Sequence, residues 1–173
     1  ESVDTIYQNA FINYDKTQIP ITIPEGVTTI GQEAFFGSLF TKIEIPKTVT
    51  EIGDCAFYYC LSLTGIYVAA DNEKYTSIDG VLFNNDKDTL IAYPAGKDAT
   101  SYTIPDGVTA IVDSDVFASC DFLTNIILPE SLMSISYSTL SSAENLTKIQ
   151  VVDGNLKYSS SEGVLFNKDK TAL

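Results

Sequence analysis

The stretch that decides the fold is Ile45-Pro-Lys-Thr-Val-Thr-Glu-Ile-Gly-Asp-Cys-Ala-Phe57, and close copies of it occupy residues 23–35 and 104–117. An apolar residue followed by Pro, or a Val where the Pro is missing, recurs every 22 to 24 residues, apart from one longer step of 36. Periods of this length are typical of solenoids, in which each repeat forms one coil and packs on its neighbours. The sequence therefore predicts a solenoid of about five to six coils.

The start of one coil can be followed through Thr41-Lys-Ile-Glu-Ile-Pro46, where apolar and polar residues alternate. This alternation places Ile43 and Ile45 on one face of a strand and the polar residues on the other. Pro46 has no N–H to donate, so it ends the strand. Gly53 then permits a tight corner that a side chain would block.

Helix is expected to be scarce. The Thr pair at 28–29 and Gly31 disfavour a helix before residue 32. We expect at most a turn or two of α- or 3₁₀-helix, around Glu33–Phe36, and strands should outweigh helix.

A longer repeat relates residues 72–90 to residues 155–173, which are identical at 12 of 19 positions with an offset of 83. In the first copy, Gly80-Val-Leu-Phe83 and Thr89-Leu-Ile-Ala-Tyr93 have the composition of strands and flank the turn-forming run Asn84–Asp88. This pattern predicts a β-hairpin inserted into one coil.

The composition excludes several classes of function. The chain has 23 acidic residues, ten lysines and no Arg, His or Trp, for a formal charge of −13. A field of this sign repels nucleic acid. The lack of histidine excludes Ser-His-Asp and Cys-His catalysis and imidazole-bound metals. The longest apolar runs are far below the roughly 20 residues of a membrane span. We expect no enzyme, cofactor, metal or membrane insertion.

Three groups of residues could suggest a site, and each has a simpler interpretation. Asn84–Asp88 and its copy at 167–170 offer oxygen ligands for calcium, but a hairpin turn explains them better. Glu25 and Glu44 could form a glycosidase pair, yet nothing distinguishes them from solvated surface charge. The chain has three cysteines, Cys55, Cys60 and Cys120. This odd number, without a CxxC motif, favours buried thiols over a disulfide.

The repeat resembles the BspA-like leucine-rich repeats of bacterial and protist cell-surface proteins. The three copies above carry the resemblance, together with Gly80-Val-Leu-Phe-Asn84 and the later Leu90-Ile-Ala-Tyr-Pro94. Two departures are local: Val112 replaces the corner Gly, and Ser136–Leu140 degrades the Gly-x-x-Ala-Phe element. The resemblance implies an α/β leucine-rich-repeat right-handed solenoid, with a strand-rich parallel sheet, short helical or 3₁₀ turns and inserted β-hairpins.

The resemblance also implies a location and a role. Its members are exported, displayed at the cell surface and associated with adhesion, and the family has no catalytic residues to carry over. The expected function is a non-enzymatic extracellular binding or adhesion module, with a host-matrix or bacterial surface protein as partner. Two alternatives stay open: a structural spacer or stalk, and a carbohydrate-binding module that uses some of the ten tyrosines for stacking.

The outward positions of stacked strands form columns, which is where repeat proteins usually bind. Tyr67 and Ile127 stand out because they would be apolar side chains with no core to enter, which suits a protein partner. Ordinary surface exposure explains them equally well. One column is expected to hold Thr22, Glu44, Tyr67, Thr103, Ile127 and Gln150, and its neighbour Lys42, Gly65, Ser101, Asn125 and Lys148.

The chain divides into residues 1–20, an N-terminal cap or the remnant of a preceding repeat, and residues 21–173, the solenoid. The second hairpin stops at Leu173, where the first copy continues through Ile91–Pro94. We therefore expect the solenoid to be truncated at its C-terminus. Because a free strand edge pairs readily with another chain, this end predicts concentration-dependent, end-to-end association.

Overall fold

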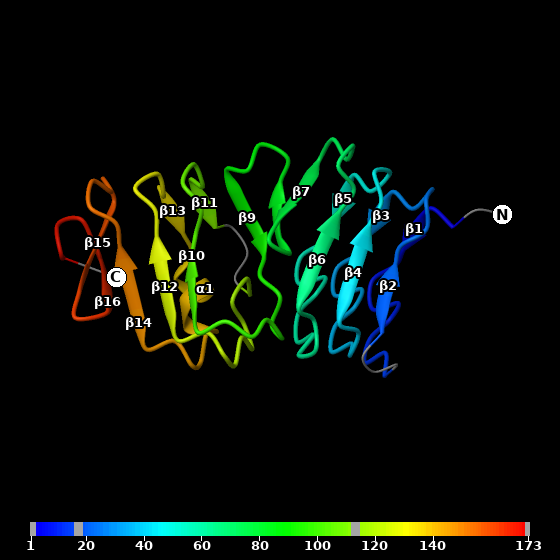
Figure 1. The fold of residues 1–173 in the computed structure, drawn as a ribbon, viewed down its shortest axis with the longest axis horizontal. Helices are drawn as coiled ribbons and strands as arrows, with labels where there is room; N and C mark the ends of the chain where they lie inside the picture. The colour runs from blue at the N-terminus through cyan, green and yellow to red at the C-terminus, as the bar shows by residue number, and fades with distance from the viewer. Residues whose placement is uncertain (1–2, 16–18, 112–114, 172–173) are drawn as a thin grey trace.

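The computed structural model describes residues 3–15, 19–111 and 115–171, which form an elongated stack of coils (Figure 1). The chain advances along the long axis of the stack, and each coil adds a strand beside the strand of the coil before it. Two parallel three-stranded sheets result. The first joins β2 (Pro20–Thr22), β4 (Lys42–Ile45) and β6 (Gly65–Val68), and the second joins β10 (Ser101–Thr103), β12 (Asn125–Leu128) and β14 (Lys148–Val151).

A second row of strands is formed by the stretches that return after each corner. These pair in parallel as well, Thr5 with Thr29 and Thr29 with Glu51 at the N-terminal end. The strands are β1 (Thr5–Ile6), β3 (Thr29–Ile30) and β5 (Glu51–Ile52), followed by β9 (Thr89–Ala92), β11 (Ala110–Ile111) and β13 (Ser134–Ile135).

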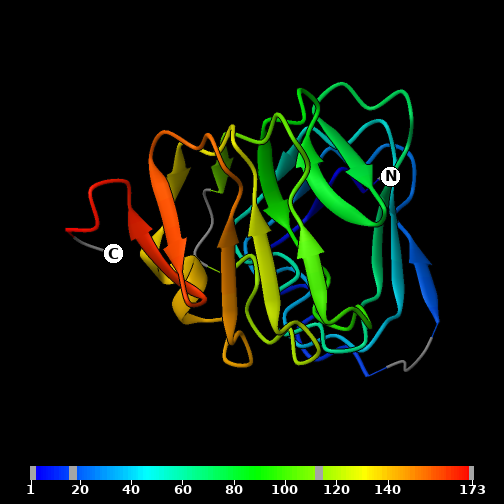
Figure 2. The ribbon, with the colours of Figure 1, turned by 60° about the vertical axis from the view of Figure 1, so that its left-hand side comes forward.

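Two hairpins are inserted into the coils, as the 83-residue repeat predicts. The first pairs β7 (Tyr75–Ile78) with β8 (Val81–Asn84), and β8 also pairs antiparallel with β9. The second pairs β15 (Tyr158–Ser161) with β16 (Val164–Asn167) and lies at the C-terminal end of the stack (Figure 2).

The first hairpin separates the two larger sheets. β6 lies against β7 and β8, and it is not hydrogen-bonded to β10. The expectation of one continuous outward column is therefore wrong, because the insertion divides the column into two rows of three residues. The strand register within each row agrees with the alternation seen in the sequence.

β8 lies between two hydrophobic cores and packs on both. The N-terminal core includes Ile43 and Leu82, and the C-terminal core includes Val81, Phe83 and Phe117. Since successive residues of a strand point to opposite sides, Leu82 packs back onto the first core, and both of its neighbours pack forward onto the second. All three β8 residues are fully buried, and each such side chain stabilises the fold by roughly 1.5–3 kcal/mol.

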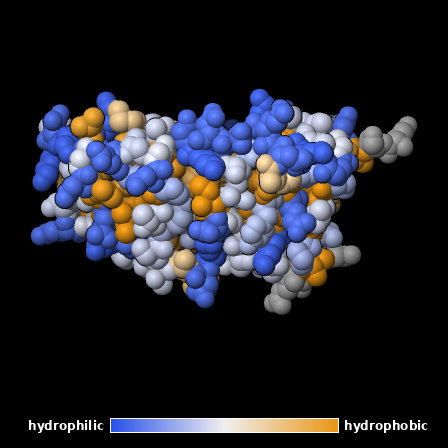
Figure 3. Space-filling view, turned by 45° about the horizontal axis from the view of Figure 1, so that its top comes forward, coloured by the Kyte–Doolittle hydropathy of each residue, from blue (hydrophilic) through white to orange (hydrophobic). Residues whose placement is uncertain are grey.

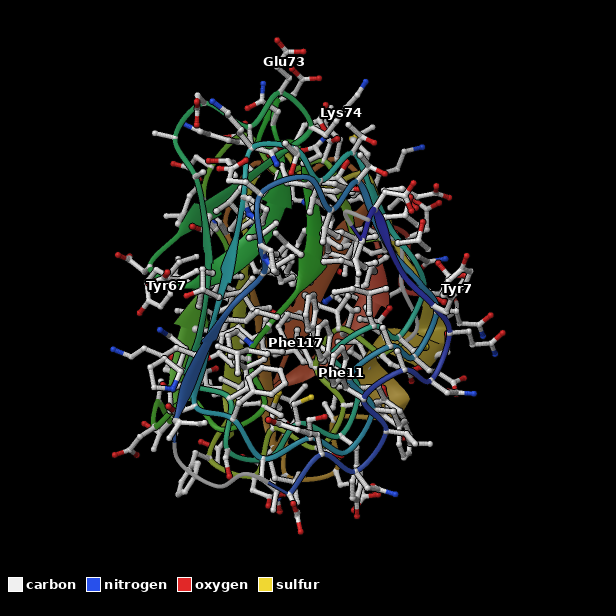
Figure 4. All side chains as sticks on the ribbon, turned by 90° about the vertical axis from the view of Figure 1, so that its right-hand side faces the viewer. Tyr7, Phe11, Tyr67, Glu73, Lys74 and Phe117 are labelled. Atoms are coloured by element: carbon white, nitrogen blue, oxygen red, sulfur yellow. The ribbon has the colours of Figure 1, made fainter. Side chains whose placement is uncertain are left out.

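Stacked phenylalanines fill the side of the coils opposite the larger sheets. The rings of Phe11 and Phe35 stack with centroids 5.3 Å apart, and Phe35 stacks on Phe57 at 5.9 Å. Figure 4, which looks down the stack from the N-terminal end, shows Phe11 and Phe117 inside the ring of coils. Phe11, Phe35 and Phe57 thus form a ladder of rings along the axis at the N-terminal end of the stack.

Two asparagines anchor the two hairpins through matching hydrogen bonds. Asn72 is buried, and its amide nitrogen donates to the backbone oxygens of Pro46 and Val49, each at 2.9 Å. Its amide oxygen accepts from the N–H groups of Lys74 and Tyr75. Asn155 makes the same four bonds 83 residues later. These side chains satisfy buried backbone groups where the coil pattern is interrupted.

No helix forms around Glu33–Phe36, which lies within the limit of a turn or two that the sequence indicates, and residues 32–37 form turns. The N–H groups of Glu33, Phe35 and Gly37 donate to carbonyl oxygens in the next coil at 2.9–3.1 Å. These groups are therefore unavailable for i to i−4 bonds within a helix. Glu33 also has a φ of +52°, which a right-handed helix does not permit.

Corner glycines let neighbouring coils approach closely. A Cβ at Gly53 would lie 2.5 Å from the backbone nitrogen of Gln32, and one at Gly31 would lie 2.6 Å from that of Gln8. No side chain fits at either distance, so each corner packs directly on the backbone of the coil before it.

Within the described residues, the single helix is α1 (Tyr137–Ser141), at the place where the Gly-x-x-Ala-Phe element is degraded. It is far too short to cross a membrane, and no longer apolar helix is found in this part of the chain. The substitution of Val112 for the corner glycine lies outside the described residues. The handedness of the solenoid and the division at residue 20 stay predictions.

Candidate functional site

The N-terminal sheet presents a row of three outward residues in register. Thr22 pairs with Glu44, and Glu44 pairs with Tyr67. The hydroxyl of Thr22 donates a hydrogen bond to the Glu44 carboxylate at 2.9 Å, which orients that carboxylate along the row. All three side chains are exposed, so the row faces solvent.

Tyr67 is the most prominent residue of this row. Its ring lies across Gly65 of the same strand, where a Cβ would come within 2.8 Å of ring atoms. The Lys42 ammonium lies 5.8 Å from the ring centroid, within the range of a cation–π contact. Tyr67 nevertheless stays 42% exposed and points away from the coils on the side opposite Tyr7 (Figure 4). The sheet therefore holds an aromatic ring in place at the surface.

Tyr67 and Glu44 also line a shallow hollow at the C-terminal ends of β4 and β6, together with Pro46 and Val68. Glu25 lines the same hollow, so the structure brings Glu25 and Glu44 to one place. Both carboxylates are exposed.

The C-terminal sheet carries the second row, Thr103, Ile127 and Gln150, in direct register. Ile127 is only partly exposed, less than the sequence led us to expect. The neighbouring positions hold Ser101, Asn125 and Lys148, and the Asn125 amide donates to the Ser101 hydroxyl at 2.8 Å. The structure thus groups the candidate residues into two faces. Lys42, Glu44 and Tyr67 lie on one, and Thr103, Asn125, Ile127, Lys148 and Gln150 on the other.

An aromatic cluster on the turn segments was missed from the sequence. Phe36 stacks on Tyr59 with ring centroids 6.1 Å apart and tilts against Tyr58 at 5.4 Å. Tyr59 is 48% exposed, and burial together with the charge of Asp115 raises the pKa of Tyr58. The signal was available, because each of these residues follows the Phe of its repeat by one or two positions.

The run Asn84–Asp88 is a hairpin turn. The Asn84 amide oxygen accepts from the N–H groups of Asp88 and Thr89, and its nitrogen donates to the Asp88 carboxylate at 2.7 Å. The hydrogen bonds from Asn84 and Thr89 hold the pKa of Asp88 below its usual value. Nowhere in the described residues do three or more acidic or cysteine side chains gather to hold a metal ion.

None of the three cysteines, all within the described ranges, forms a disulfide. Cys60 and Cys120 are buried, and burial raises the pKa of both thiols to about 12. Cys55 is half-buried, which departs from the expectation of three buried thiols, and its sulfur donates to the Asp115 carboxylate at 3.1 Å.

Residues 4–94 and 91–168 match the family described as the BspA type leucine-rich repeat region, with six copies. This match covers nearly the whole chain. The protein belongs to the BspA-type leucine-rich repeat family. No curated protein matches the chain.

Solved structures of bacterial repeat proteins resemble this BspA-type chain. A leucine-rich cell-surface protein from Faecalibacterium prausnitzii is 33% identical, with a TM-score of 0.57 over 68% of this chain and 37% of its own length. The pneumococcal vaccine antigen PcpA is 27% identical, with a TM-score of 0.66 over 85% of this chain and 42% of its own. A leucine-rich repeat protein from Eubacterium ventriosum, 22% identical with a TM-score of 0.59, shares the fold over 95% of this chain and 55% of its own.

The BspA-type chain thus spans about half or less of the length of these solved relatives. Its family consists of repeat proteins, and nothing in the described residues points to catalysis. Membership in a family with cell-surface relatives is consistent with a protein-binding or adhesion role.

Proposed function

We propose that the protein is a non-enzymatic, extracellular adhesion module that binds another protein through the outward face of its N-terminal sheet. The observation that carries the proposal is the ordered exposure of Tyr67 over Gly65, beside Lys42 and Glu44. Tyrosine is among the residues that contribute most to protein interfaces. A ring already held in place loses little conformational freedom on binding.

The charges around Tyr67 favour a polar protein surface as partner. Lys42 and Glu44 both lie on β4, the strand next to Tyr67, so the face carries both signs of charge within one small area. Charges of both signs beside an aromatic ring orient a partner whose surface carries the complementary charges. The net charge of −13 disfavours nucleic acid as partner.

The second sheet supplies a smaller contact area of the same kind. Ile127 is its apolar centre, and Thr103, Asn125, Lys148 and Gln150 surround it. The inserted hairpin divides the two faces, so a partner that spans both would touch the half-buried strand β7 as well. We propose a host-matrix or bacterial surface protein as the partner, since solved relatives include a cell-surface protein.

The test is a pull-down from host-matrix and bacterial surface extracts with four forms of the protein. These are the wild type, Tyr67→Ala, Ile127→Ser and the matched control Tyr59→Ala, which removes a similarly exposed tyrosine on the turn segments. The proposal predicts a protein retained by the wild type and by Tyr59→Ala and lost with Tyr67→Ala. A partner that binds all four forms equally would contradict it.

Two other results would favour the alternatives. If no form retains a protein, the chain acts as a spacer or stalk. If a glycan array gives signals that disappear with Tyr59→Ala, the cluster of Phe36, Tyr58 and Tyr59 is a carbohydrate platform, since aromatic rings stack on sugar faces.

A further inference from the structure

Three aromatic rings meet on the turn segments of two neighbouring coils. Phe36 and Tyr58 take the same position in their repeats, and Tyr59 takes the position of Gly37. Because Gly37 has no side chain, the ring of Tyr59 has room to reach back to Phe36, on which it stacks. Tyr58 lies against both of the other rings, with centroids 5.4 and 5.9 Å away. Phe36, Tyr58 and Tyr59 are called here the aromatic cluster.

The aromatic cluster is accessible from solvent. Tyr59 is 48% exposed, and Phe36 and Tyr58 are partly exposed. Figure 3 shows a side of the molecule on which apolar atoms reach the surface in separate patches, with hydrophilic side chains between them. Three rings in mutual contact form a broader apolar surface than a single exposed side chain, and surfaces of this kind are often functional.

Beside the cluster, the regular hydrogen bonding between turn segments is interrupted. In the preceding coils, a backbone N–H of each turn segment donates to a carbonyl oxygen of the next one. Phe11 donates to Ala34 at 2.8 Å, and Phe35 donates to Ala56 at 2.9 Å. The equivalent N–H of Phe57 has no acceptor among the described residues. A backbone donor is therefore left over next to the aromatic cluster.

The coil that follows explains the missing acceptor. It connects β9 to β10 with eight residues, 93–100, whereas the coil before it connects β5 to β6 with 12, 53–64. The short connection lies directly against the preceding coil, where a Cβ at Gly96 would come within 2.5 Å of the backbone oxygen of Leu61. The turn segment that would supply a carbonyl oxygen to Phe57 is thus missing from this coil.

A small notch lies at this interruption. Tyr58 lines it from the coil before, and Asp115 and Ala118 line it from the coil after. The thiol of Cys55 donates to the Asp115 carboxylate between these two coils, at 3.1 Å. The free volume of the notch is about 30 Å³, which holds a hydroxyl group or a water and is too small for a peptide main chain. The notch therefore suits the small polar groups of a ligand whose body lies outside it.

The charges near the aromatic cluster are negative. Burial raises the pKa of Tyr58, and the charges of Asp115 and Glu144 add to the shift, so both carboxylates lie near the cluster. Residues 31–38 and 53–60, the turn segments that carry the cluster, hold two acidic residues and no lysine. This field repels anionic ligands and favours a ligand that is neutral and donates hydrogen bonds.

A neutral sugar combines the properties that these groups require. One face of a pyranose ring presents C–H groups, which pack on the partially negative face of an aromatic ring. Hydroxyl groups both donate and accept hydrogen bonds, so one sugar can bond to a carboxylate and to a backbone N–H.

We propose that the aromatic cluster and the notch form a binding site for a neutral sugar residue of an oligosaccharide. The sugar stacks on Tyr59 and Phe36, and its hydroxyls bond to the Asp115 carboxylate and the Phe57 N–H, since both residues line the notch. This site lies on the turn segments and stands independently of the protein-binding face around Tyr67. It adds to that face and does not replace it.

A glycan array of neutral, sialylated and sulfated oligosaccharides tests the proposal. It is probed with the 173-residue protein, with Tyr59→Ala and with the control Tyr67→Ala, which removes a similarly exposed tyrosine from the sheet face. The wild type and the control should bind a set of neutral glycans, and Tyr59→Ala should lose them. For the glycan with the strongest signal, titration calorimetry should give a Kd at least about tenfold higher for Tyr59→Ala.

Two further variants make the test independent of folding and include the notch. Tyr59 has a φ of +62° and the equivalent Gly37 has +68°, so Tyr59→Gly removes the ring at a position that suits glycine. It should lose the glycans and keep the circular dichroism of the wild type. Asp115→Asn keeps the size of the side chain and removes its charge, so it should weaken binding of the same glycan.

Several results would overturn the proposal. One is a wild type that binds no neutral glycan, and another is binding of sialylated or sulfated glycans as strong as that of neutral ones. Glycan binding that persists in Tyr59→Ala and Tyr59→Gly, or that disappears with Tyr67→Ala, would place the sugar elsewhere. A protein that Tyr59→Ala fails to retain, together with an empty array, would show that the aromatic cluster contacts a protein instead.

Discussion

The phenolic oxygen of Tyr75 accepts a hydrogen bond from the backbone N–H of Ile52 at 3.0 Å. Ile52 belongs to β5, the last strand of the sheet β1-β3-β5, so its N–H would otherwise lack a strand partner. Tyr158 does the same for Ile135 of β13, at 3.2 Å. Each hairpin thus provides a tyrosine hydroxyl that accepts a hydrogen bond from the last short strand in its row.

Replacing Tyr75 with Phe should lower the free energy of unfolding by about 1–2 kcal/mol, because the Ile52 N–H loses its partner while the ring stays in place. Urea denaturation measures the change. Tyr59→Phe, at a residue that is about half exposed, is the control and should change stability by less than about 0.5 kcal/mol. Equal stabilities for the wild type and Tyr75→Phe would show that the hydroxyl bond contributes nothing.

Asn72→Ala should lower the free energy of unfolding by about 3 kcal/mol, more than Tyr75→Phe does. The reason is that four hydrogen bonds to backbone groups are lost at a buried position. Asn72→Asp should also destabilise, since a carboxylate accepts from Lys74 and Tyr75 but donates nothing to Pro46 and Val49. Thermal denaturation of both variants checks this. An Asp variant as stable as the wild type would contradict the role given to the amide nitrogen.

The repeat units and their strand registers could be predicted because they depend on local alternation. Lys42, Ile43, Glu44 and Ile45 take the outward and inward positions that their order indicates. The turns around Glu33 could not be predicted in this way. Their N–H groups bind carbonyl oxygens of the next coil, and this partner belongs to the tertiary structure rather than to the local sequence.

Alkaline pH should destabilise the fold. Burial raises the pKa of Tyr93 and Tyr102, with Cys120 adding to the effect at the first and Tyr93 at the second. A phenol whose pKa is raised in the folded state binds its proton more tightly there. Its stabilising contribution is therefore complete below the unfolded value of about 10 and is lost as pH rises above it. The urea concentration at which half of the protein is unfolded should be lower at about pH 11 than at about pH 8. A midpoint independent of pH across this window would contradict the assignment.

Thiol reactivity should differ sharply among the three cysteines. Cys60 and Cys120 are buried with pKa values raised to about 12, so both stay protonated and inaccessible in the native protein. A chromogenic disulfide reagent should label the half-buried Cys55 alone in the native state and all three after denaturation. Cys55→Ser should leave the native protein unlabelled. Fast labelling of a second thiol would show that one of the two buried sites opens readily.

The candidate face was predicted in part. The strand alternation places Glu44 and Tyr67 outward and in register. The division of the column into two faces could not be predicted, because it depends on where the inserted hairpin packs. The contact between Tyr67 and Gly65 depends on a side-chain conformation that the sequence does not specify. The sequence also does not indicate that Ile127 is less exposed than Tyr67, because the packing of Ile127 is set by its neighbours in the sheet.

The most direct test of the binding face is the affinity of a captured partner for immobilised wild type, Tyr67→Ala and Tyr59→Ala. If Tyr67 is the centre of the interface, its loss should weaken binding by at least about 2 kcal/mol, roughly 30-fold in Kd. Tyr59→Ala should bind like the wild type. Equal affinities for Tyr67→Ala and the wild type would show that the partner binds elsewhere on the solenoid.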